Sequence, residues 1–517
     1  MIRFSGFYSI LCIALSFCLL SCKQNQNPLA TEEDSKPNIV FLYTDDQTFA
    51  SVRALGQDEI YTPNLDRMVN SGTSFTHAYN MGGWHGAICV ASRSMIISGA
   101  FLWNAKQKDS LWNAKDTVAL EQTWPKLMEQ QGYTTYMTGK WHVQAPADVI
   151  FSRTEHIRPG MPGDRRGQLS AAFKKWEKTS GDMTDWNDYL PMEYARPTDE
   201  NDTDWSPTDT LQGGFWEGGI HWSEVVRNDA LDFLKEAEEK EDPFFMYLAF
   251  NAPHDPRQAP QRFLDMYPLD SIAVPESFLP EYPWKDAIGN QPTLRDEALA
   301  PYPRTAYAVK KHRQEYYAII SHLDEQIGKI LDALEASGKM ENTYIFFGAD
   351  HGLSVGQHGL LGKQSLFDHS IRVPLIVMGP DVPKGQRITQ DIYLQDIMAT
   401  SLDLAAVKKP DYVQFKSFKP LLYGENTNGH YNGVYGAYMN LQRMIRKDSY
   451  KLIIYPKIDK VLLFDMEQDP NEMNDLATQP QYKEKVSTLF KDLMELQKTM
   501  NDSLDLQPTY EKVVGIP

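Results

Sequence analysis

Four short, uninterrupted apolar runs constrain the fold of this 517-residue chain more than any other feature. They cover residues 38–43, 244–250, 344–348 and 374–378. Runs of this length are typical of strands that are buried on both faces, as in a parallel sheet covered by helices. The chain is also long enough to bury a large core, so we expect one large α/β domain with an appendage.

Amphipathic helical patterns separate these runs. They cover residues 117–131, 223–240 and about 304–337. The longest pattern ends at Gly338 and places an apolar stripe on one side, made of Tyr317, Ile320, Leu323, Ile327, Ile330, Leu331 and Leu334. The alternation of strands and helices predicts a large, mostly parallel sheet sandwiched by helices.

Two stretches break this alternation. Residues 151–222 are rich in Trp, Asp, Gly and Pro without a clear period, and we expect them to form long ordered loops over the sheet. After about residue 410 the pattern changes to short strands at 451–455 and 461–464 and a late helix at 481–500. This change predicts a main domain over residues 37–410 and a smaller C-terminal α+β subdomain over residues 411–517.

The N-terminus has the pattern of an export signal. Arg3 precedes a short apolar run that ends in Ser21 and Cys22, and the run is too short for a comfortable membrane span. Residues 19–22 resemble a bacterial lipobox, which implies a signal peptide over residues 1–21, lipidation of Cys22 and a flexible tether over residues 22–36. An ordinary signal peptide with a chance cysteine is the alternative. We expect an exported protein without a transmembrane helix in the mature chain: a periplasmic lipoprotein anchored to a membrane, or one at the cell surface.

Charge and cysteine content narrow the function further. The chain has 51 basic and 69 acidic residues, and its net charge of −18 argues against binding to nucleic acid. An anionic substrate would therefore need cations gathered locally at its site. Of the four cysteines, Cys12 and Cys18 lie in the predicted signal and Cys22 at the predicted lipid anchor, so Cys89 has no partner for a disulfide.

Polar side chains follow three of the four apolar runs. They are Asp45, Asp46, His254, Asp350 and His351. Because ligands bind at the carboxyl ends of strands in open α/β sheets, we expect these groups on one rim. Three carboxylates and a histidine would suit a hard divalent cation, whereas any single Asp at such a position could instead cap a helix.

Residues 86–99 (GAICVASRSMIISG) and 132–142 (GYTTYMTGKWH) carry a family resemblance. The first resembles the Cys-x-Pro/Ala-x-Arg signature of type I sulfatases, members of the alkaline phosphatase superfamily, and the second resembles another signature of that family. The likeness extends to residues 37–40, Asp45-Asp46, residues 252–254, 350–352, 362–363, 372–375 and 463–470. It covers nearly the whole mature chain; Ala91 stands where the commonest signature has Pro.

The resemblance implies an alkaline phosphatase-like fold and a specific chemistry. A maturation enzyme would oxidise Cys89 to formylglycine, whose hydrate attacks the sulfur of a sulfate ester on one divalent cation, Ca²⁺ rather than Mg²⁺. The implied metal ligands are Asp45, Asp46, residue 89, Asp350 and His351. Lys140 and Lys363 would bind sulfate oxygens, Arg93 would orient the hydrate and His142 would act as base. His254 is the predicted general acid, with His142 and Lys363 as alternatives.

The substrate is expected to be a sulfated saccharide, such as an oligosaccharide from ulvan, carrageenan or a glycosaminoglycan. Five aromatic or hydrogen-bonding side chains in the loops would suit a sugar ring, with ordinary packing as the alternative for each: Trp84, His85, Trp216, His221 and Arg257. Two other functions remain open from the sequence. One is a phosphodiesterase or phosphonate monoesterase of the same superfamily, and the other is a non-catalytic saccharide-binding relative.

Overall fold

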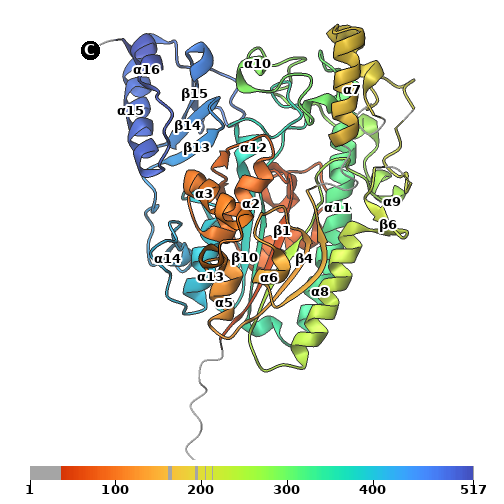
Figure 1. Cartoon of the computed structure of the whole chain (residues 1–517), viewed down its shortest axis with the longest axis vertical. Helices are drawn as coiled ribbons and strands as arrows, with labels where there is room; N and C mark the ends of the chain where they lie inside the picture. The colour runs from red at the N-terminus through yellow and green to blue at the C-terminus, as the bar shows by residue number, and fades with distance from the viewer. Residues whose placement is uncertain (1–35, 161–165, 192–195, 204, 212, 516–517) are drawn as a thin grey trace, which may run out of the picture. The chain divides into compact units, whose positions relative to one another are not determined.

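The structure is a computed structural model that describes residues 36–160, 166–191, 196–203, 205–211 and 213–515. The predicted signal peptide over residues 1–21, the predicted lipidation site Cys22 and all of the predicted tether except Lys36 lie outside the described residues. Residues 36–517 form one compact unit (Figure 1).

A sheet of nine strands forms the centre of this unit. Its order is β11-β2-β10-β9-β1-β8-β4-β5, and β12 also pairs with β2. Strands β9, β1, β8, β4 and β5 are parallel to one another, while β10 is antiparallel to both β9 and β2. The predicted mostly parallel sheet is therefore confirmed. The strands are β1 (Asn38–Thr44), β2 (Thr73–Tyr79), β4 (Thr134–Lys140), β5 (Arg153–Arg158), β8 (Phe244–Ala249), β9 (Thr343–Ala349), β10 (Arg372–Met378), β11 (Gln386–Ile388) and β12 (Ile392–Tyr393).

Helices cover both faces of the sheet, which explains why its central strands are apolar throughout. In β1, Phe41 packs into one core with α5 (Trp124–Glu129) and α13 (Asp396–Leu404), whereas Leu42 packs into another with α8 (Trp222–Glu238) and α11 (Ala306–Ala336). Helices α8 and α11 lie together on one side of the sheet in Figure 1, with α5 and α13 on the other. Each strand thus contributes alternate residues to two separate apolar layers.

Several predicted elements differ in detail. The pattern over residues 117–131 is two helices, α4 (Thr117–Glu121) and α5, because Pro125 lies in the first turn of the second. The stretch 151–222 adds β5 to the edge of the main sheet, and also contains α7 (Arg166–Thr179) and the hairpin of β6 (Trp216–Glu217) and β7 (Ile220–His221). The other helices in the main domain are α1 (Pro63–Ser71), α2 (Ile88–Ser98), α3 (Leu102–Asn113), α6 (Ala147–Ile150), α9 (Gln261–Leu264), α10 (Lys285–Ile288) and α12 (Asp368–Ile371).

A second sheet has the order β16-β15-β14-β13-β3. Strands β13 (Val434–Tyr438), β14 (Gln442–Lys447), β15 (Tyr450–Tyr455) and β16 (Lys460–Asp465) form an antiparallel meander. Helices α14 (Lys419–Leu422), α15 (Lys483–Thr499) and α16 (Gln507–Val514) also belong to this part of the chain. Its fifth strand, β3 (Gly82–Gly83), comes from far earlier in the sequence, so the C-terminal α+β subdomain is joined to the main domain by a shared sheet.

Among the described residues, no single helix is long and apolar enough to cross a membrane. Helices α2 and α3 pass that test only as a pair bent by 87°, and every residue of α2 is buried within the protein.

Candidate active site

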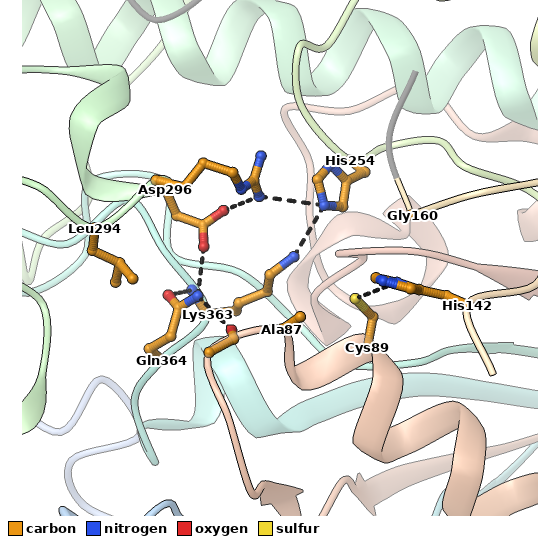
Figure 2. Close-up of a pocket in the computed structure, with 11 residues that line it drawn as sticks. Ala87, Cys89, His142, Gly160, His254, Leu294, Asp296, Lys363 and Gln364 are labelled. Carbon is orange, nitrogen blue, oxygen red and sulfur yellow. Dashed lines mark hydrogen bonds and ion pairs between the residues drawn. The ribbon is translucent and has the colours of Figure 1, made fainter. Parts of the chain in front are cut away.

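The predicted functional groups meet at the carboxyl ends of the central parallel strands. Asp45 and Asp46 follow β1, Lys140 ends β4, and Asp350 and His351 follow β9. The segment after β8 brings His254, and the first turn of α2 brings Cys89. A cavity of about 160 Å³ opens onto Cys89, His142, His254 and Lys363 (Figure 2).

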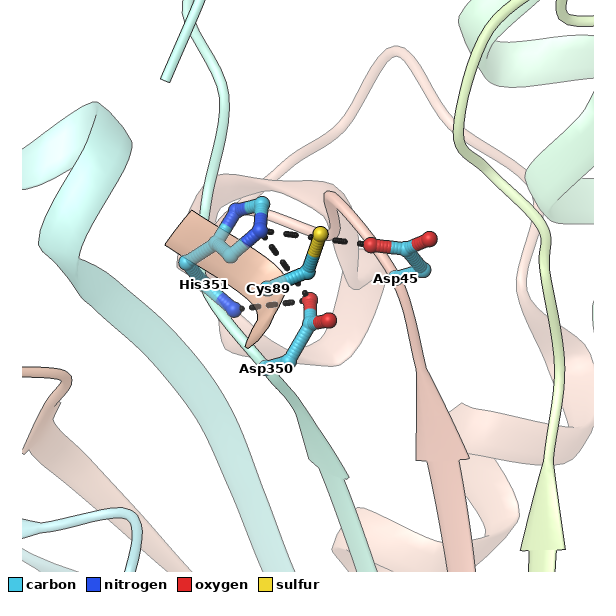
Figure 3. A group of neighbouring side chains, drawn as sticks. All are labelled: Asp45, Cys89, Asp350 and His351. Carbon is cyan, nitrogen blue, oxygen red and sulfur yellow. Dashed lines mark hydrogen bonds and ion pairs between the residues drawn. The ribbon is translucent and has the colours of Figure 1, made fainter. Parts of the chain in front are cut away.

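Two overlapping groups of buried side chains could hold a metal ion. One group is Asp45, Cys89, Asp350 and His351, drawn in Figure 3, and the other is Asp45, Asp46 and His254; in each, the ligand atoms lie within 4.8 Å of one another. Among the described residues, Asp45 Oδ1, Asp46 Oδ2 and His351 Nε2 are buried without a hydrogen-bond partner. Unpartnered anionic oxygens are costly in a protein interior, so this donor set fits a hard divalent cation.

Three cations lie against the three carboxylates. Lys140 forms a short ion pair with Asp45, and Lys363 Nζ lies 2.8 Å from Asp46 Oδ1. Arg93 Nε donates to Asp350 Oδ2 at 2.9 Å, and all of these side chains are almost fully buried. Arg93 lies one helical turn after Cys89 on α2, as the spacing predicted, so one helix presents both residues to the site.

This arrangement shifts the pKa values of the carboxyl groups in opposite directions. Burial and the negative charge of Asp350 raise the pKa of Asp45 well above its usual range. Burial also opposes ionisation of Asp46, but Lys363, His254 and His351 together outweigh it and lower the pKa of that group. For Asp350, His351 and Arg93 outweigh burial and lower the pKa to about 2. The site therefore favours the charged form of two of its three carboxyl groups.

The same cations act on Cys89. Burial would raise the pKa of its thiol, but Lys140, His142 and Lys363 lower it well below the usual range. His142 Nδ1 lies 3.2 Å from Cys89 Sγ. An anionic group at position 89 is thus strongly stabilised, which is a property required of a nucleophile.

The hydrogen bonds of His254 define its tautomer. Nδ1 lies 2.7 Å from the carbonyl oxygen of Asp255, which can only accept, so Nδ1 carries the proton. Nε2 faces two donors, Lys363 Nζ at 3.2 Å and Arg295 Nη2 at 3.4 Å, and therefore accepts. Burial and Lys363 also lower the pKa of His254 well below its usual range. In this arrangement Lys363, rather than the predicted acid His254, carries the proton that faces the cavity.

Comparison with protein-family models identifies the family of this chain. Residues 37–407 match the sulfatase family model, and residues 356–499 match the model for the C-terminal region of N-sulphoglucosamine sulphohydrolase. This chain belongs to the sulfatase family. The predicted family and enzyme class, a sulfuric ester hydrolase, are confirmed.

Relatives and solved structures cover almost the whole sulfatase chain. It is 29% identical to an arylsulfatase of Clostridium perfringens, with 89% of this chain and 94% of the relative covered. It is 27% identical to an N-acetylglucosamine-6-O-sulfatase of Bacteroides thetaiotaomicron, with 95% and 91% covered.

Two solved structures share the fold. A structure described as a complex with the substrate D-glucosamine-2-N,6-O-disulfate aligns with a TM-score of 0.67 at 23% identity, covering 90% of this chain and 99% of the other. A phosphonate monoester hydrolase of Agrobacterium radiobacter aligns with a TM-score of 0.65 at 17% identity, covering 90% and 96%. The predicted fold class is confirmed, and the fold alone does not separate sulfate from phosphonate hydrolysis.

The sulfatase cavity has a wall that sequence analysis missed. Leu294, Arg295 and Asp296 lie in the long connection between β8 and α11, and Gln364 directly follows Lys363. No periodic pattern or motif distinguishes residues 294–296 in the sequence. For Gln364, its position beside a predicted site lysine was the only available signal.

None of the five predicted substrate-binding residues is among the residues that line this cavity. Arg257 is fully buried, with Nη1 3.1 Å from His312 Nδ1. His221 caps α8 by accepting from the backbone N–H of Ser223, and Trp216 packs edge-on against its ring. Arg257 and His221 are placed to stabilise the fold, so direct contact between either residue and a substrate is not expected.

The other two predicted substrate-binding residues lie close to the nucleophile position. Trp84 and His85 precede α2 and are partly exposed. His85 Nδ1 accepts from the backbone N–H of Ala87, itself a cavity residue. This bond places His85 directly behind the cavity lining.

Proposed function

We propose that this sulfatase removes sulfate from a saccharide, using a formylglycine made from Cys89 and one divalent cation, Ca²⁺. The observation that carries the proposal is the convergence of a buried, anion-stabilised position 89 with three carboxylates, His351 and two lysines. The names of relatives support the saccharide class. They include the N-acetylglucosamine-6-O-sulfatase and an ulvan-active sulfatase of Formosa agariphila, 25% identical over 91% of this chain and 83% of its own length.

The chain's own residues supply most of the chemistry. When bound by Asp45, Asp46, Asp350 and His351, a divalent cation would supply a Lewis acid that lowers the pKa of the nucleophile and polarises the sulfate. Lys140 and Lys363 lie where they can offset negative charge on sulfate oxygens, which is needed because the protein as a whole is acidic.

Proton movement would depend on two further groups. His142 lies within reach of a proton on residue 89. Lys363, with His254 behind it, can protonate the leaving alcohol. This assignment changes the predicted role of His254 from acid to partner of the acid.

Modification of Cys89 is tested by mass spectrometry of the peptide that contains residue 89. The protein is made with and without a formylglycine-generating maturation enzyme. We expect the aldehyde mass, and sulfate release, only with that enzyme, and we expect Cys89→Ala to lose all activity while it keeps the wild-type melting temperature. Activity in Cys89→Ala, or full activity with an unmodified thiol, would contradict the proposal.

The cation is tested by chelation. Protein treated with a chelator and then dialysed should regain a higher melting temperature on addition of Ca²⁺, with a smaller effect of Mg²⁺, because a ligand that binds only the folded state stabilises it. Asp350→Asn should abolish this shift. An equal melting temperature with and without divalent cations would argue against the metal site.

The similarity to a phosphonate monoester hydrolase favours one second candidate. Comparing kcat/KM for an aryl sulfate and an aryl phosphonate monoester separates the two activities. A preference for the phosphonate would overturn the proposal. Formylglycine at residue 89 without hydrolysis of any sulfate ester would favour a saccharide-binding protein instead.

We also propose that the protein is exported and lipidated at Cys22. The supporting observation is the lipobox-like sequence at residues 19–22. Labelling cells with a fatty acid should mark the wild-type protein and not the Cys22→Ser variant. Equal labelling of both would contradict this assignment.

A further inference from the structure

The wall of the cavity opposite His142 is formed by residues 294–296 and Gln364 (Figure 2). It differs in charge from the floor. The floor carries Lys363, one of the two lysines proposed to offset the sulfate charge. The wall carries Arg295 and Asp296, with Asp255 behind them.

The guanidinium group of Arg295 already forms ion pairs within the protein. Its Nη1 donates to Asp255 Oδ2, and its Nη2 forms a short ion pair with Asp296 Oδ1. The side chains of Asp255 and Asp296 are 2% and 4% exposed, and that of Arg295 is 15% exposed. Arg295 therefore lies between two carboxylates. Asp255, on which the buried Arg257 also acts, lies behind the wall, whereas Asp296 is the carboxylate that lines the cavity.

Asp296 also has unused capacity to accept hydrogen bonds. Its Oδ1 accepts from Arg295, and its Oδ2 accepts from Gln364 Nε2. An ionised carboxylate has about four acceptor positions and no donor. Asp296 therefore offers a substrate an acceptor for hydroxyl groups, and its negative charge disfavours an anionic group in direct contact with it.

We propose that Asp296 determines substrate specificity by selecting a sugar that carries a free hydroxyl beside the scissile sulfate. The hydroxyl donates to Asp296, whereas a second sulfate or a carboxylate at that position cannot donate and is repelled by the Asp296 carboxylate. This inference rests on the proposed saccharide sulfatase function and names a narrower substrate class within it: saccharides without a second anionic group next to the ester.

The test compares matched pairs of substrates. Each pair is a galactose or N-acetylglucosamine monosulfate and the same sugar with a second sulfate on the neighbouring carbon. The measured quantity is the ratio of kcat/KM for the monosulfate to that for the disulfate. For the wild type we expect a ratio of at least about ten, because a like charge within a few ångströms is poorly screened in a cavity.

Two variants change the charge of the wall in the same direction. Asp296→Asn removes one negative charge and should lower the ratio severalfold. Leu294→Lys adds a cation beside Asp296 and should bring the ratio to one or below. Because each ratio is taken on a single preparation, a loss of folded protein in either variant cancels. Asp286→Asn is the matched control: this side chain on α10 is 68% exposed and should leave the ratio unchanged.

The outcomes separate this inference from the proposed function. If the wild type hydrolyses disulfates as fast as monosulfates, or if Asp296→Asn keeps the wild-type ratio, the inference is overturned and the saccharide sulfatase function remains. If no saccharide sulfate is hydrolysed while an aryl sulfate is, the proposed substrate class fails and the inference fails with it.

Discussion

Two residues of the active site, Asp46 and His142, have backbone φ angles of 65° and 58°. Residues other than glycine seldom adopt this conformation, and such positions are concentrated at functional sites. Each comes within a few residues of a strand end, where the chain turns away from the sheet. The turn at Asp46 is held in place by Tyr316, whose hydroxyl donates to the Asp46 carbonyl oxygen at 2.7 Å.

The position of the His142 ring also depends on a glycine. A Cβ atom at residue 160 would lie 2.5 Å from His142 Cε1, closer than real Cβ atoms approach. Gly160→Ala should therefore push the ring away from Cys89 and lower kcat by roughly tenfold to a hundredfold, with little change in melting temperature. Gly429→Ala is the control, because a Cβ there meets nothing within 4 Å. Wild-type kcat in Gly160→Ala would show that the ring position is not critical.

For individual residues, the sequence predicted which charged groups form the site better than it predicted which residues line the cavity around them. Asp45, Asp350 and Lys140 stand at strand ends or in motifs, and the structure brings them together. Burial depends on residues distant in sequence, so the buried positions of Arg257 and His221 could not be read from their neighbours.

Strand β10 illustrates what an element's own sequence cannot reveal. Its apolar run resembles those of β1, β8 and β9, and its burial was predicted correctly, yet it runs antiparallel to its neighbours. A strand that is buried on both faces has the same apolar pattern in either direction. Direction is set by the connections and by pairing across the sheet, which a single strand does not encode.

Helix α1 begins with a cap that comes from another helix. Asp324 on α11 accepts from the backbone N–H of Asn64 at 3.1 Å and of Leu65 at 2.7 Å, while Thr62, the residue before α1, makes no side-chain capping bond. The two bonds satisfy donors in the first turn of α1 that have no partner within the helix. A carboxylate is also favourable beside the positive end of a helix.

Asp324 gives the stability of the fold a measurable pH dependence. Burial raises its pKa from 3.8 to about 6 in the folded protein. A raised pKa means that the folded state binds the proton more tightly than the unfolded state, so the group's contribution is present below pH 3.8 and is lost as the pH rises through 6. The free energy of unfolding of the wild type, minus that of Asp324→Asn, should fall by roughly 1–3 kcal/mol between about pH 4 and 7.

Urea unfolding at several pH values measures this difference. Asp332→Asn on the same helix, with a side chain that is 68% exposed, should show no such trend. A difference between wild type and Asp324→Asn that stays constant with pH would contradict the assignment.

For the molecule as a whole, a buried ion cluster connects the second sheet to the main domain. Lys451 on β15 is fully buried and lies 2.7 Å from both Asp368 Oδ1, on α12, and Glu472 Oε1. Burial raises the pKa of Glu472 to about 7, whereas Lys451 and Arg372 outweigh burial at Asp368 and lower its pKa to about 2. Lys451 thus pairs with two carboxyl groups from different parts of the chain, and Arg372 assists it at Asp368.

Removal of that lysine should destabilise the whole molecule. Lys451→Met removes the cation that pairs with Glu472 and leaves Asp368 with Arg372 alone, so it should lower the free energy of unfolding by about 3–5 kcal/mol. Lys447→Met on β14 breaks a more exposed pair with Asp492 and should cost less than about 1 kcal/mol. Chemical denaturation measures both. Equal losses in the two variants would contradict a special role for Lys451.

The family and the main architecture could be predicted because sequence motifs and strand patterns are local. The joining of the two sheets could not be predicted, because it depends on β3, a strand of two glycines that has no sequence pattern of its own. Gly82 and Gly83 pair with Ala437 and Tyr438, and a Cβ at residue 82 would lie 2.0 Å from the Ala437 carbonyl oxygen. The close approach of β13 therefore requires glycine at position 82.

Pairing between β3 and β13 also sets an order of events during synthesis. Strand β3 lies directly before the helix that carries Cys89, yet its partner is made much later. At roughly 5–20 residues per second, β13 follows β3 from the ribosome after tens of seconds. During that time the second sheet cannot close beside Cys89. If Cys89 is modified as proposed above, the enzyme would reach it most easily on a nascent chain, before the C-terminal strands fold.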